Sequence, residues 1–262
     1  MNIDQQQLEQ NESEPVGLVV DFVRHEKPEY KGEEFASGNL EGELSPASLV
    51  AARAHAEGLA ATIDKDNELV VFWVSPKRRA RQTYSVYQNV FREQGVHMYE
   101  SGFDRMFNES LRDVKTSGGD IAALSEGMKA AGVDWGAWME YWSETAALPP
   151  TTETPEELAR RSARVITYLE RIARTIAPNT TKRLHFICIG HEEGVRDLLE
   201  AALGQGTKKG TGPAYGERIH AEIVPSVREQ VSDEYALAKI NVSFRETKGT
   251  VAFDPRSRVF VR

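Results

Sequence analysis

Residues 19–28 read VVDFVRHEKP, a mostly apolar run that is followed at once by Arg24 and His25. Runs of four to eight mainly apolar residues are typical of a strand that is buried on both faces. Core packing gives no reason for an arginine and a histidine side by side at the carboxyl end of such a strand. We therefore expect this strand to deliver both side chains to a functional site.

Two later stretches repeat this layout. Residues 69–83, LVVFWVSPKRRARQT, predict a buried strand and then a helix with Ser75 as N-cap and Pro76 as its first residue. Residues 184–199, LHFICIGHEEGVRDLL, predict a third buried strand, a turn and His191 at the start of an amphipathic helix. Open α/β sheets bind ligands at the carboxyl ends of strands, and helix N-termini favour anions. The expected ligand is a phosphoryl group.

The order of these motifs resembles that of the histidine phosphatase superfamily, also called the phosphoglycerate mutase-like or branch 1 group. The resemblance runs from about residue 16 to the C-terminal strands, and SPxxRAxQT at residues 75–83 is its most specific part. It implies a covalent phosphohistidine on one histidine and a phosphate pocket completed by three further side chains. These residues are His25, and then Arg24, Arg79 and His191. Arg79 is selected among its cationic neighbours because it directly precedes Ala80, as in the family pattern.

The resemblance also implies a carboxyl group as general acid, usually a glutamate that follows a leucine and one more residue. In residues 107–114, FNESLRDV, the order LRD places Asp113 in this role, and Glu109 fits a variant of the pattern and remains the alternative. Two more cations are candidate substrate contacts. Lys27 could supply a donor that the first motif otherwise lacks, and Arg81 could face the outer side of the phosphate.

Two positions depart from the family pattern. Glycine often follows each motif histidine in the family, whereas here Glu26 follows His25 and Glu192 follows His191. A carboxylate directed into the pocket would repel a phosphate dianion and raise the pKa of neighbouring histidines. Either both glutamates point away from the pocket, or the pocket is altered.

The length of 262 residues and the absence of a break in composition favour one large α/β domain. The resemblance implies a three-layer α/β/α sandwich with a mostly parallel central sheet, of the phosphoglycerate mutase-like type. We expect residues 16–262 to form this domain with a helical insertion at about 115–150. The polar residues 1–15 are expected to be a disordered arm.

Hydrophobic spacing gives further local expectations. A helix that starts at Ser45 and Pro46 should bury a stripe on the sheet: Leu49, Ala52, Ala56, Leu59 and Ile63. A long helix should follow residues 149–157. Short strands are expected at 96–99 and, in the tail, near 219–224, 236–244 and 258–261. Lys77 and Arg78 are interpreted as solvated surface charges, and His185 as a packed residue that points away from the site.

Charge and cysteine content limit the partners. The net charge of -8 argues against nucleic acid or an anionic membrane, so a small phosphorylated substrate is the expected partner. Cys188 is the only cysteine, so no disulfide forms within the chain, and a cytoplasmic location follows from the reducing compartment this favours. No apolar run is long enough to span a membrane, and the polar start shows no signal peptide. A monomer and a homodimer both remain open.

The leading functional hypothesis is a metal-independent phosphatase that hydrolyses a phosphomonoester through a phosphohistidine intermediate, with no cofactor. An imidazole with a reference pKa of about 6.5 is largely unprotonated near neutral pH, so His25 needs no separate base. Two alternatives stay open: a phosphoglycerate mutase-type phosphotransferase, and a catalytically weak module that binds a phosphorylated ligand. A metal site of His25, His191 and Asp113 is disfavoured because two arginines would lie beside the dication.

Overall fold

The computed structural model describes most of the chain in ten segments. The described residues are 17–31, 34, 41–99, 107–116, 118–133, 138–144, 148–206, 208, 210–225 and 237–261. The arm predicted for residues 1–15 lies outside them.

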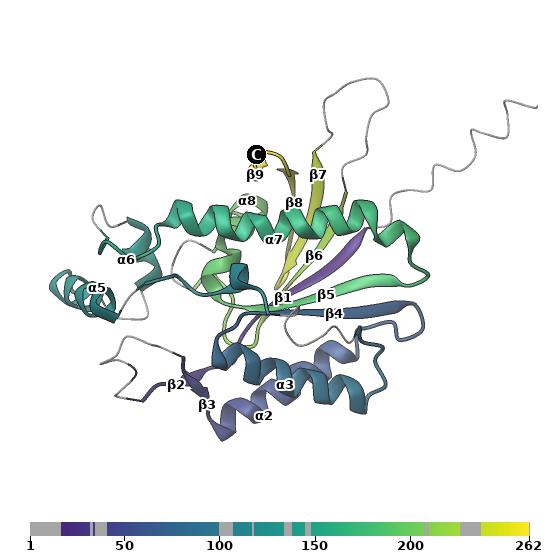
Figure 1. Cartoon of the computed structure of the whole chain (residues 1–262), viewed down its shortest axis with the longest axis horizontal. Helices are drawn as coiled ribbons and strands as arrows, with labels where there is room; N and C mark the ends of the chain where they lie inside the picture. Colours follow the sequence, from purple (N-terminus) through teal and green to yellow (C-terminus); the bar gives the residue numbers. More distant parts are fainter. Residues whose placement is uncertain are drawn as a thin grey trace, which may run out of the picture.

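Within these segments, a mixed sheet of seven strands forms the centre of the molecule, in the order β4-β5-β1-β6-β7-β8-β9 (Figure 1). The strands are β1 (Leu18–Arg24), β4 (Glu68–Val74), β5 (Arg183–Gly190), β6 (Arg218–Val224), β7 (Ala238–Phe244), β8 (Thr247–Asp254) and β9 (Val259–Val261). β4, β5 and β1 are parallel, whereas β6 to β9 continue the sheet antiparallel. The parallel core therefore carries all three sequence motifs.

The register of the parallel core brings the ends of its strands together. Arg24 pairs with Gly190, and Val74 pairs with Ile189. Because all three strands run in the same direction, the residues that follow them emerge at one edge of the sheet. His25, Ser75 and His191 are therefore placed close together by strand pairing alone.

Helices cover both faces of the sheet. α2 (Pro46–Ala60) and α3 (Arg78–Glu93) pack on one face, and α7 (Pro155–Thr175) with α8 (Arg196–Leu203) packs on the other (Figure 1). The three-layer α/β/α architecture is confirmed. α2 begins after Ser45, whose side chain accepts a hydrogen bond from the Ser48 amide, as expected of an N-cap. The expected burial of Leu49 is wrong, because this side chain is 38% exposed.

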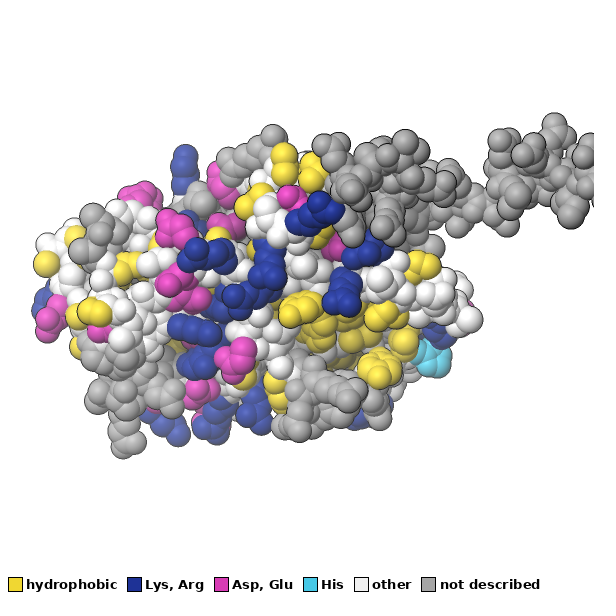
Figure 2. Space-filling view, turned by 45° about the horizontal axis from the view of Figure 1, so that its top comes forward, with side chains coloured by type: hydrophobic (Ala, Val, Ile, Leu, Met, Phe, Trp, Pro, Cys, Tyr) yellow, Lys and Arg dark blue, Asp and Glu magenta, His cyan; other side chains and the backbone are white. Residues whose placement is uncertain are grey.

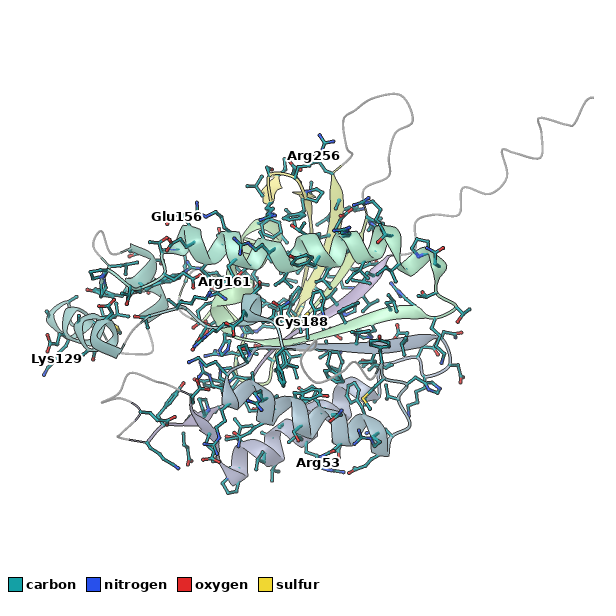
Figure 3. The ribbon with its side chains drawn as sticks, viewed as in Figure 1. Arg53, Lys129, Glu156, Arg161, Cys188 and Arg256 are labelled. Carbon is teal, nitrogen blue, oxygen red and sulfur yellow. The ribbon has the colours of Figure 1, made fainter. Side chains whose placement is uncertain are left out.

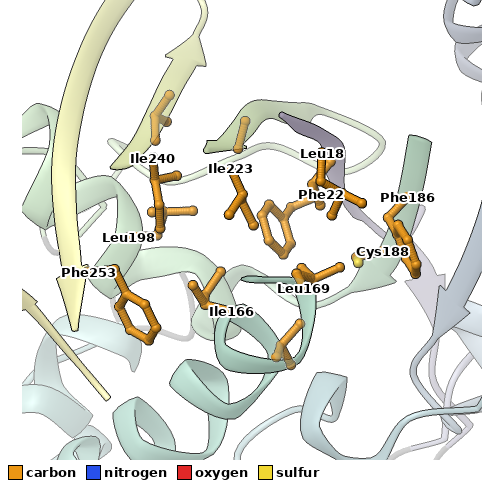
Figure 4. Close-up of a cluster of buried hydrophobic side chains, with 14 of the residues drawn as sticks. Leu18, Phe22, Ile166, Leu169, Phe186, Cys188, Leu198, Ile223, Ile240 and Phe253 are labelled. Carbon is orange, nitrogen blue, oxygen red and sulfur yellow. The ribbon is translucent and has the colours of Figure 1, made fainter. Parts of the chain in front are cut away.

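Alternation along β1 divides its side chains between the two faces. Leu18, Val20 and Phe22 join the cluster against α7 and α8, which also contains Cys188 of β5 (Figure 4). Val23 joins the cluster against α2 and α3. Complete burial of one large apolar side chain stabilises the fold by about 1.5–3 kcal/mol, so this division anchors β1 between both helical layers.

α7 shows why one helix can serve the core and the surface at once. Its inner face buries Leu158, Val165 and Leu169. Its outer face carries exposed arginines: Arg160, Arg164, Arg171 and Arg174. The space-filling view of this side shows dark blue cationic side chains beside a yellow hydrophobic area (Figure 2). The helix starts with a capping box of Thr154 and Glu157.

The region expected to be a helical insertion contains α5 (Gly118–Ala130) and α6 (Trp138–Glu144). Trp142 is fully buried and donates a hydrogen bond from Nε1 to the Glu153 carbonyl oxygen at 2.9 Å. It is therefore a core residue. Trp135 and the side chain of Trp138 lie outside the residues that the structure describes.

Two predictions for the shorter strands differ from the structure. Residues 96–99 form no strand and contribute only a single bridge between Val70 and Met98. The tail contains β8 in addition to the three strands that were predicted. The remaining short elements are β2 (Pro28–Glu29), β3 (Glu43–Leu44), η2 (Glu109–Leu111), η4 (Ala177–Asn179) and η5 (Glu192–Val195). No helix in the described segments is long and apolar enough to cross a membrane.

Candidate active site

His25 lies directly after β1 and is 5% exposed. Its backbone amide donates to the Gly190 carbonyl oxygen at 3.0 Å, which holds the residue against the end of β5. Its Nδ1 lies 2.6 Å from the Glu26 carbonyl oxygen. Because a carbonyl oxygen only accepts, Nδ1 carries the proton and Nε2 keeps its lone pair.

His191 lies directly after β5, with its ring centroid 4.8 Å from that of His25. Its Nε2 is 2.9 Å from the Ser75 hydroxyl oxygen, and its Nδ1 is 3.3 Å from Nη2 of Arg79. Since a guanidinium group can only donate, Nδ1 is the acceptor and Nε2 donates to Ser75. The two rings therefore have opposite tautomers.

Arg79 joins these two histidines. It is 4% exposed and donates from Nε to Nε2 of His25 at 2.9 Å. Its Nη2 donates to Oδ2 of Asp113 at 2.6 Å, and its Nη1 to the Glu41 carbonyl oxygen at 3.0 Å. These hydrogen bonds fix the orientation of the Arg79 guanidinium group. A fork held in this way is suited to bidentate contact with an oxyanion.

Both histidines of this cluster are held neutral. Burial lowers the pKa of His25 well below its usual value, and the proximity of the second titratable imidazole, His191, and of the Arg79 guanidinium group lowers it further. Burial and then Arg79 and Lys77 have the same effect on the pKa of His191. A neutral His25 with an unprotonated Nε2, whose lone pair accepts a hydrogen bond from Arg79, has the protonation state that a nucleophile requires.

Arg24 is the last residue of β1 and pairs with Gly190 of β5, next to both histidines in the sequence register. Its guanidinium group lies 4.0 Å from the centroid of the Tyr215 ring and donates to the Pro213 carbonyl oxygen at 2.8 Å. Its Nη1 is 2.6 Å from Oε2 of Glu192. The Tyr215 ring is 5.8 Å from that of His25, so this tyrosine forms part of the same wall.

Asp113 is carried by a loop that α7 holds in place. Arg161 of α7 is buried and donates to the carbonyl oxygens of Arg112 at 2.7 Å and Asp113 at 2.9 Å (Figure 3). Its Nε and Nη2 also bind the Glu153 carboxylate at 2.7 and 2.6 Å. This buried pair fixes residues 109–113, and so places Asp113 against Arg79.

Comparison with known proteins agrees with this geometry. The family model of the histidine phosphatase superfamily (branch 1) matches residues 20–211, which contain all the residues of the cluster. The chain belongs to this superfamily. A comparison with curated protein sequences gives no match.

Solved structures share the fold at low sequence identity. A phosphoglycerate mutase from Bacillus anthracis str. Sterne aligns with a TM-score of 0.55 and 17% identity, over 81% of this chain and 90% of that one. A mycobacterial hydrolase aligns with a TM-score of 0.54 and 14% identity, over 89% and 92%. YhfR from Bacillus stearothermophilus aligns with a TM-score of 0.51 and 13% identity, over 79% and 91%. These similarities establish the histidine phosphatase fold.

The two departures from the superfamily pattern have different outcomes. The Glu26 carboxylate turns away from the phosphate side and lies 2.6 Å from Nδ1 of His55, so that only its backbone carbonyl contacts His25. The Glu192 carboxylate remains at the site through its ion pair with Arg24. The Glu26 carboxylate is therefore paired away from His25, whereas the Glu192 carboxylate is paired with one of the predicted phosphate-binding arginines.

The start of α3 differs from the prediction. The helix begins at Arg78 with Lys77 as N-cap, not at Ser75 and Pro76. The reason is that the Ser75 hydroxyl binds His191. The interpretation of Lys77 as a solvated charge is also wrong, because it is 7% exposed and its Nζ lies 3.4 Å from Glu41. Arg78 is exposed and pairs with Glu43 on the surface, in line with its interpretation.

The remaining candidates lie at the rim or farther away. Lys27 is exposed, and its carbonyl oxygen accepts a hydrogen bond from the Ser48 hydroxyl group. Arg81 is exposed, with its guanidinium group 5.1 Å from the centroid of the Phe107 ring. Glu109 is exposed and lies 3.4 Å from Arg112. These three side chains are therefore more exposed than the buried residues clustered around Arg79.

The sequence reasoning missed two residues of the site. Ser75 was predicted only as a helix cap, and no role was predicted for Tyr215, whose ring lies 5.8 Å from that of His25. Ser75 follows β4 directly, which was the available signal, whereas only the fold brings Tyr215 next to His25. Glu193 in the turn after His191 was also not considered, and its pKa is raised to about 7 by burial and then by Asp113.

Proposed function

We propose that this histidine phosphatase superfamily member is a metal-independent phosphatase that hydrolyses a phosphomonoester through a phosphohistidine on His25. The observation that carries the proposal is the 2.6 Å contact between Nδ1 of His25 and the Glu26 carbonyl oxygen. It fixes the tautomer in which Nε2 is unprotonated, and this nitrogen accepts a hydrogen bond from Nε of Arg79 at 2.9 Å. Nε2 is therefore the nucleophilic atom.

Charge on the transferred phosphoryl group would be balanced by this chain's own cations. Arg79 and Arg24 offer guanidinium forks, and His191 supports Arg79 through Nδ1. Preorganised donors of this kind supply the electrostatic stabilisation on which phosphoryl transfer depends. The substrate must displace Glu192 from Arg24, which favours dianionic phosphomonoesters over weaker anions. The proposed step needs no metal, since the guanidinium groups provide the positive charge.

The substrate in this proposal is a small phosphorylated molecule. A reducing, cytoplasmic environment belongs to the same proposal, because Cys188 is buried in β5 and has no second cysteine as a partner. Its thiol pKa is raised by burial, which makes a role as thiolate nucleophile unfavourable.

The test is phosphate release from a panel of phosphorylated metabolites, combined with trapping of the phosphoenzyme. We expect turnover of at least one phosphomonoester and a covalent phosphate that is labile in acid and stable in alkali. His25→Ala should abolish both signals. His97→Ala is the matched control, because His97 is exposed and should leave both unchanged. Phosphate binding without turnover at any pH would contradict the phosphatase and favour a binding module.

A further inference from the structure

Glu26 carries a buried carboxylate directly after the proposed nucleophile. Its side chain is only 3% exposed. With the described residues this carboxylate forms a single hydrogen bond, which Nδ1 of His55 donates to Oε1 at 2.6 Å. His55 belongs to α2, and its own side chain is 46% exposed. A buried carboxylate that has lost its partner is costly, so the position of the Glu26 side chain depends on His55.

The backbone of Glu26 contacts the catalytic cluster. Its carbonyl oxygen accepts from Nδ1 of His25 at 2.6 Å. Its amide donates to Oγ1 of Thr83 at 3.1 Å, and this hydroxyl group donates to the Arg79 carbonyl oxygen at 3.0 Å. Since the side chain and the backbone belong to one short residue, a shift of the carboxylate also shifts the oxygen that holds the His25 ring.

Gly216 covers the contact between Glu26 and His55. Its φ is +73°, and a Cβ at this position would collide with Nδ1 of His55 and Oε1 of Glu26. Glycine is therefore required both by the backbone conformation and by the two side chains beneath it. The amide of Gly216 donates to the Arg24 carbonyl oxygen at 3.0 Å. The segment that is bound to Arg24 thus also encloses this hydrogen bond.

Part of His55 faces solvent. Its side chain lines a cavity of about 650 Å³, whose wall also includes Tyr87 and Arg218. Among the described residues, the lining of this cavity does not include Arg79 or His191. His55 can therefore be replaced without a new void in the core and without a direct change at the phosphate-binding donors.

We propose that His55 is a positioning residue for the nucleophile: through the Glu26 carboxylate it fixes the carbonyl oxygen that orients the His25 ring. The inference rests on the proposed phosphatase function, in which the phosphoryl group is transferred to Nε2 of His25. Nε of Arg79 donates to this nitrogen and has to release it before the nitrogen can bond to phosphorus. The hydrogen bond at Nδ1 then keeps the ring directed at the phosphoryl group. His55 acts through Glu26 and contacts no reacting atom.

Removal of the imidazole tests this role. In His55→Ala, the rate of phosphoenzyme formation from p-nitrophenyl phosphate should fall by about 10-fold, because a displaced nucleophile reacts more slowly. Inhibition by inorganic phosphate should change by less than about 2-fold, because the groups that bind the anion remain. These groups are Arg24, Arg79 and His191. Weaker phosphate binding with an unchanged rate of phosphoenzyme formation would overturn the proposal.

Two amide variants separate the hydrogen bond from the rest of the side chain. His55→Asn places an amide nitrogen near the position of Nδ1, so it should restore the donor and most of the rate. His55→Gln places its amide near the position of Nε2, so the rate should stay low. Arg53→Ala is the control on the same helix (Figure 3), because Arg53 pairs with Glu57 and Glu93 at the surface, and it should leave the rate unchanged. Equal rates for His55→Ala and His55→Asn would contradict the assignment.

The proton on Nδ1 of His25 gives a readout that needs no turnover. Its short hydrogen bond to Glu26 should shift the NMR resonance downfield and slow exchange with water. The resonance is assigned by its absence from His25→Ala. It should move upfield and exchange faster in His55→Ala, and His55→Asn should restore it. An unchanged resonance in His55→Ala would show that the Glu26 carbonyl group keeps its place without His55, and the proposal would fail.

Failure of the inference differs from failure of the proposed function. If His25→Ala abolishes the phosphoenzyme while His55→Ala keeps both its rate and its Nδ1 resonance, only the role of His55 is wrong. If His25→Ala retains turnover, the phosphohistidine mechanism is wrong, and the Nδ1 resonance still decides whether His55 orients the ring. Thermal unfolding shows which variants are folded. Should His55→Ala not fold, the comparison of His55→Asn with His55→Gln decides in its place.

Discussion

Buried histidines occupy two regions of this molecule and differ in charge. His25 and His191 lie at the carboxyl edge of the parallel core, whereas His185 lies in the middle of β5. Their exposed fractions are similar, at 5%, 4% and 3%. Yet the pKa values of the first two are lowered well below the usual value, and that of His185 is raised to about 9. Burial alone therefore does not decide the charge of a histidine.

The charged side chains next to each histidine decide whether it is protonated. Burial disfavours the charged form of every histidine, and at the active site the neighbouring arginines act in the same direction. His185 instead lies between two carboxylates, with Nε2 2.8 Å from Asp21 and Nδ1 3.1 Å from Glu68. These two negative charges outweigh the desolvation. Asp21 is fully buried and also accepts from His220 at 3.0 Å.

The difference separates a reactive imidazole from a structural one. The nucleophile that we propose, His25, must stay unprotonated. The arginines around it favour this neutral form because they repel the positive charge of a protonated imidazole. The network of Asp21, His185 and Glu68 compensates charge inside the sheet, where an unpaired carboxylate would be costly. Substitutions that exchange these environments should affect turnover in one region and stability in the other.

The largest expected effect follows from the removal of Arg79. Arg79→Met removes the hydrogen-bond donors to His25, His191 and Asp113. It also removes a positive charge that would bind the phosphoryl group of the substrate. Turnover should fall by about 10³- to 10⁵-fold, the scale of an arginine in phosphoryl transfer. The acid limb of the pH-rate profile should move upward, because the pKa of His25 rises when a neighbouring cation is lost. Kinetics with p-nitrophenyl phosphate from pH 5 to about 9 would measure both. An unshifted acid limb would show that Arg79 does not set this titration.

The next effect concerns stability. Asp21→Asn leaves His185 and His220 without their shared carboxylate, and the loss of one partner of a buried ion pair costs about 3–5 kcal/mol. The free energy of unfolding in urea should fall by this amount, while the folded variant should keep its kcat. Asp66→Asn, at an exposed aspartate, is the control and should change stability by less than about 0.5 kcal/mol. A large loss of kcat in folded Asp21→Asn would contradict the separation of the two regions.

The third effect is a pH dependence of stability. The pKa of His185 in the folded protein is about 9, above the usual value of 6.5. The raised pKa therefore contributes stability that is fully present below pH 6.5 and is lost as the pH rises through 9. The contribution is on the order of 3 kcal/mol. For His185→Gln, the decline in unfolding free energy between these pH values should be smaller by this amount. Parallel curves for the two proteins would be evidence against a charged His185.

His25 and His191 contribute with the opposite sign. Their pKa values are lowered in the folded protein, so the unfolded chain binds more protons below about pH 6.5. They therefore decrease stability as the pH falls. The two regions together favour a stability maximum between the acid range, where the active-site histidines oppose folding, and the alkaline range, where His185 loses its proton.

The sequence predicted the parallel core and its cluster for a definite reason. Apolar runs mark buried strands, and cationic or imidazole groups at their ends have no packing role, so Arg24, His25 and His191 could be found from local pattern. Arg79 was selected among its cationic neighbours only through the resemblance to the family pattern. β8 was missed because the first half of Thr247–Asp254 is polar and partly exposed, and only pairing with β7 reveals it.

Residues whose environment is set by distant segments could not be predicted. The burial of Lys77 depends on Glu41 and Asp113, and the network of His185 depends on carboxylates of two other strands. The raised pKa of Glu193 depends first on its burial and then on Asp113, which lies 80 positions earlier in the sequence. A local sequence pattern can identify an unusual residue, but only the fold determines which charged side chains lie next to it.

Substitution of Ser75 should have the smallest effect on turnover. It tests whether the hydrogen-bond partners of His191 fix its tautomer. Its hydroxyl oxygen accepts from Nε2 of His191 at 2.9 Å, which leaves Nδ1 as the acceptor toward Arg79. Ser75→Ala removes this acceptor and leaves a buried N–H group unpaired, at a cost of about 1–3 kcal/mol. Most of this cost should appear as lower stability, and kcat/KM should fall by only about 5- to 10-fold, because Arg79 still holds the ring. Ser75→Thr should restore both values, and Ser85→Ala, at an exposed serine of α3, should change neither. If Ser75→Ala lowers stability but leaves kcat/KM unchanged, the tautomer of His191 is fixed by Arg79 alone.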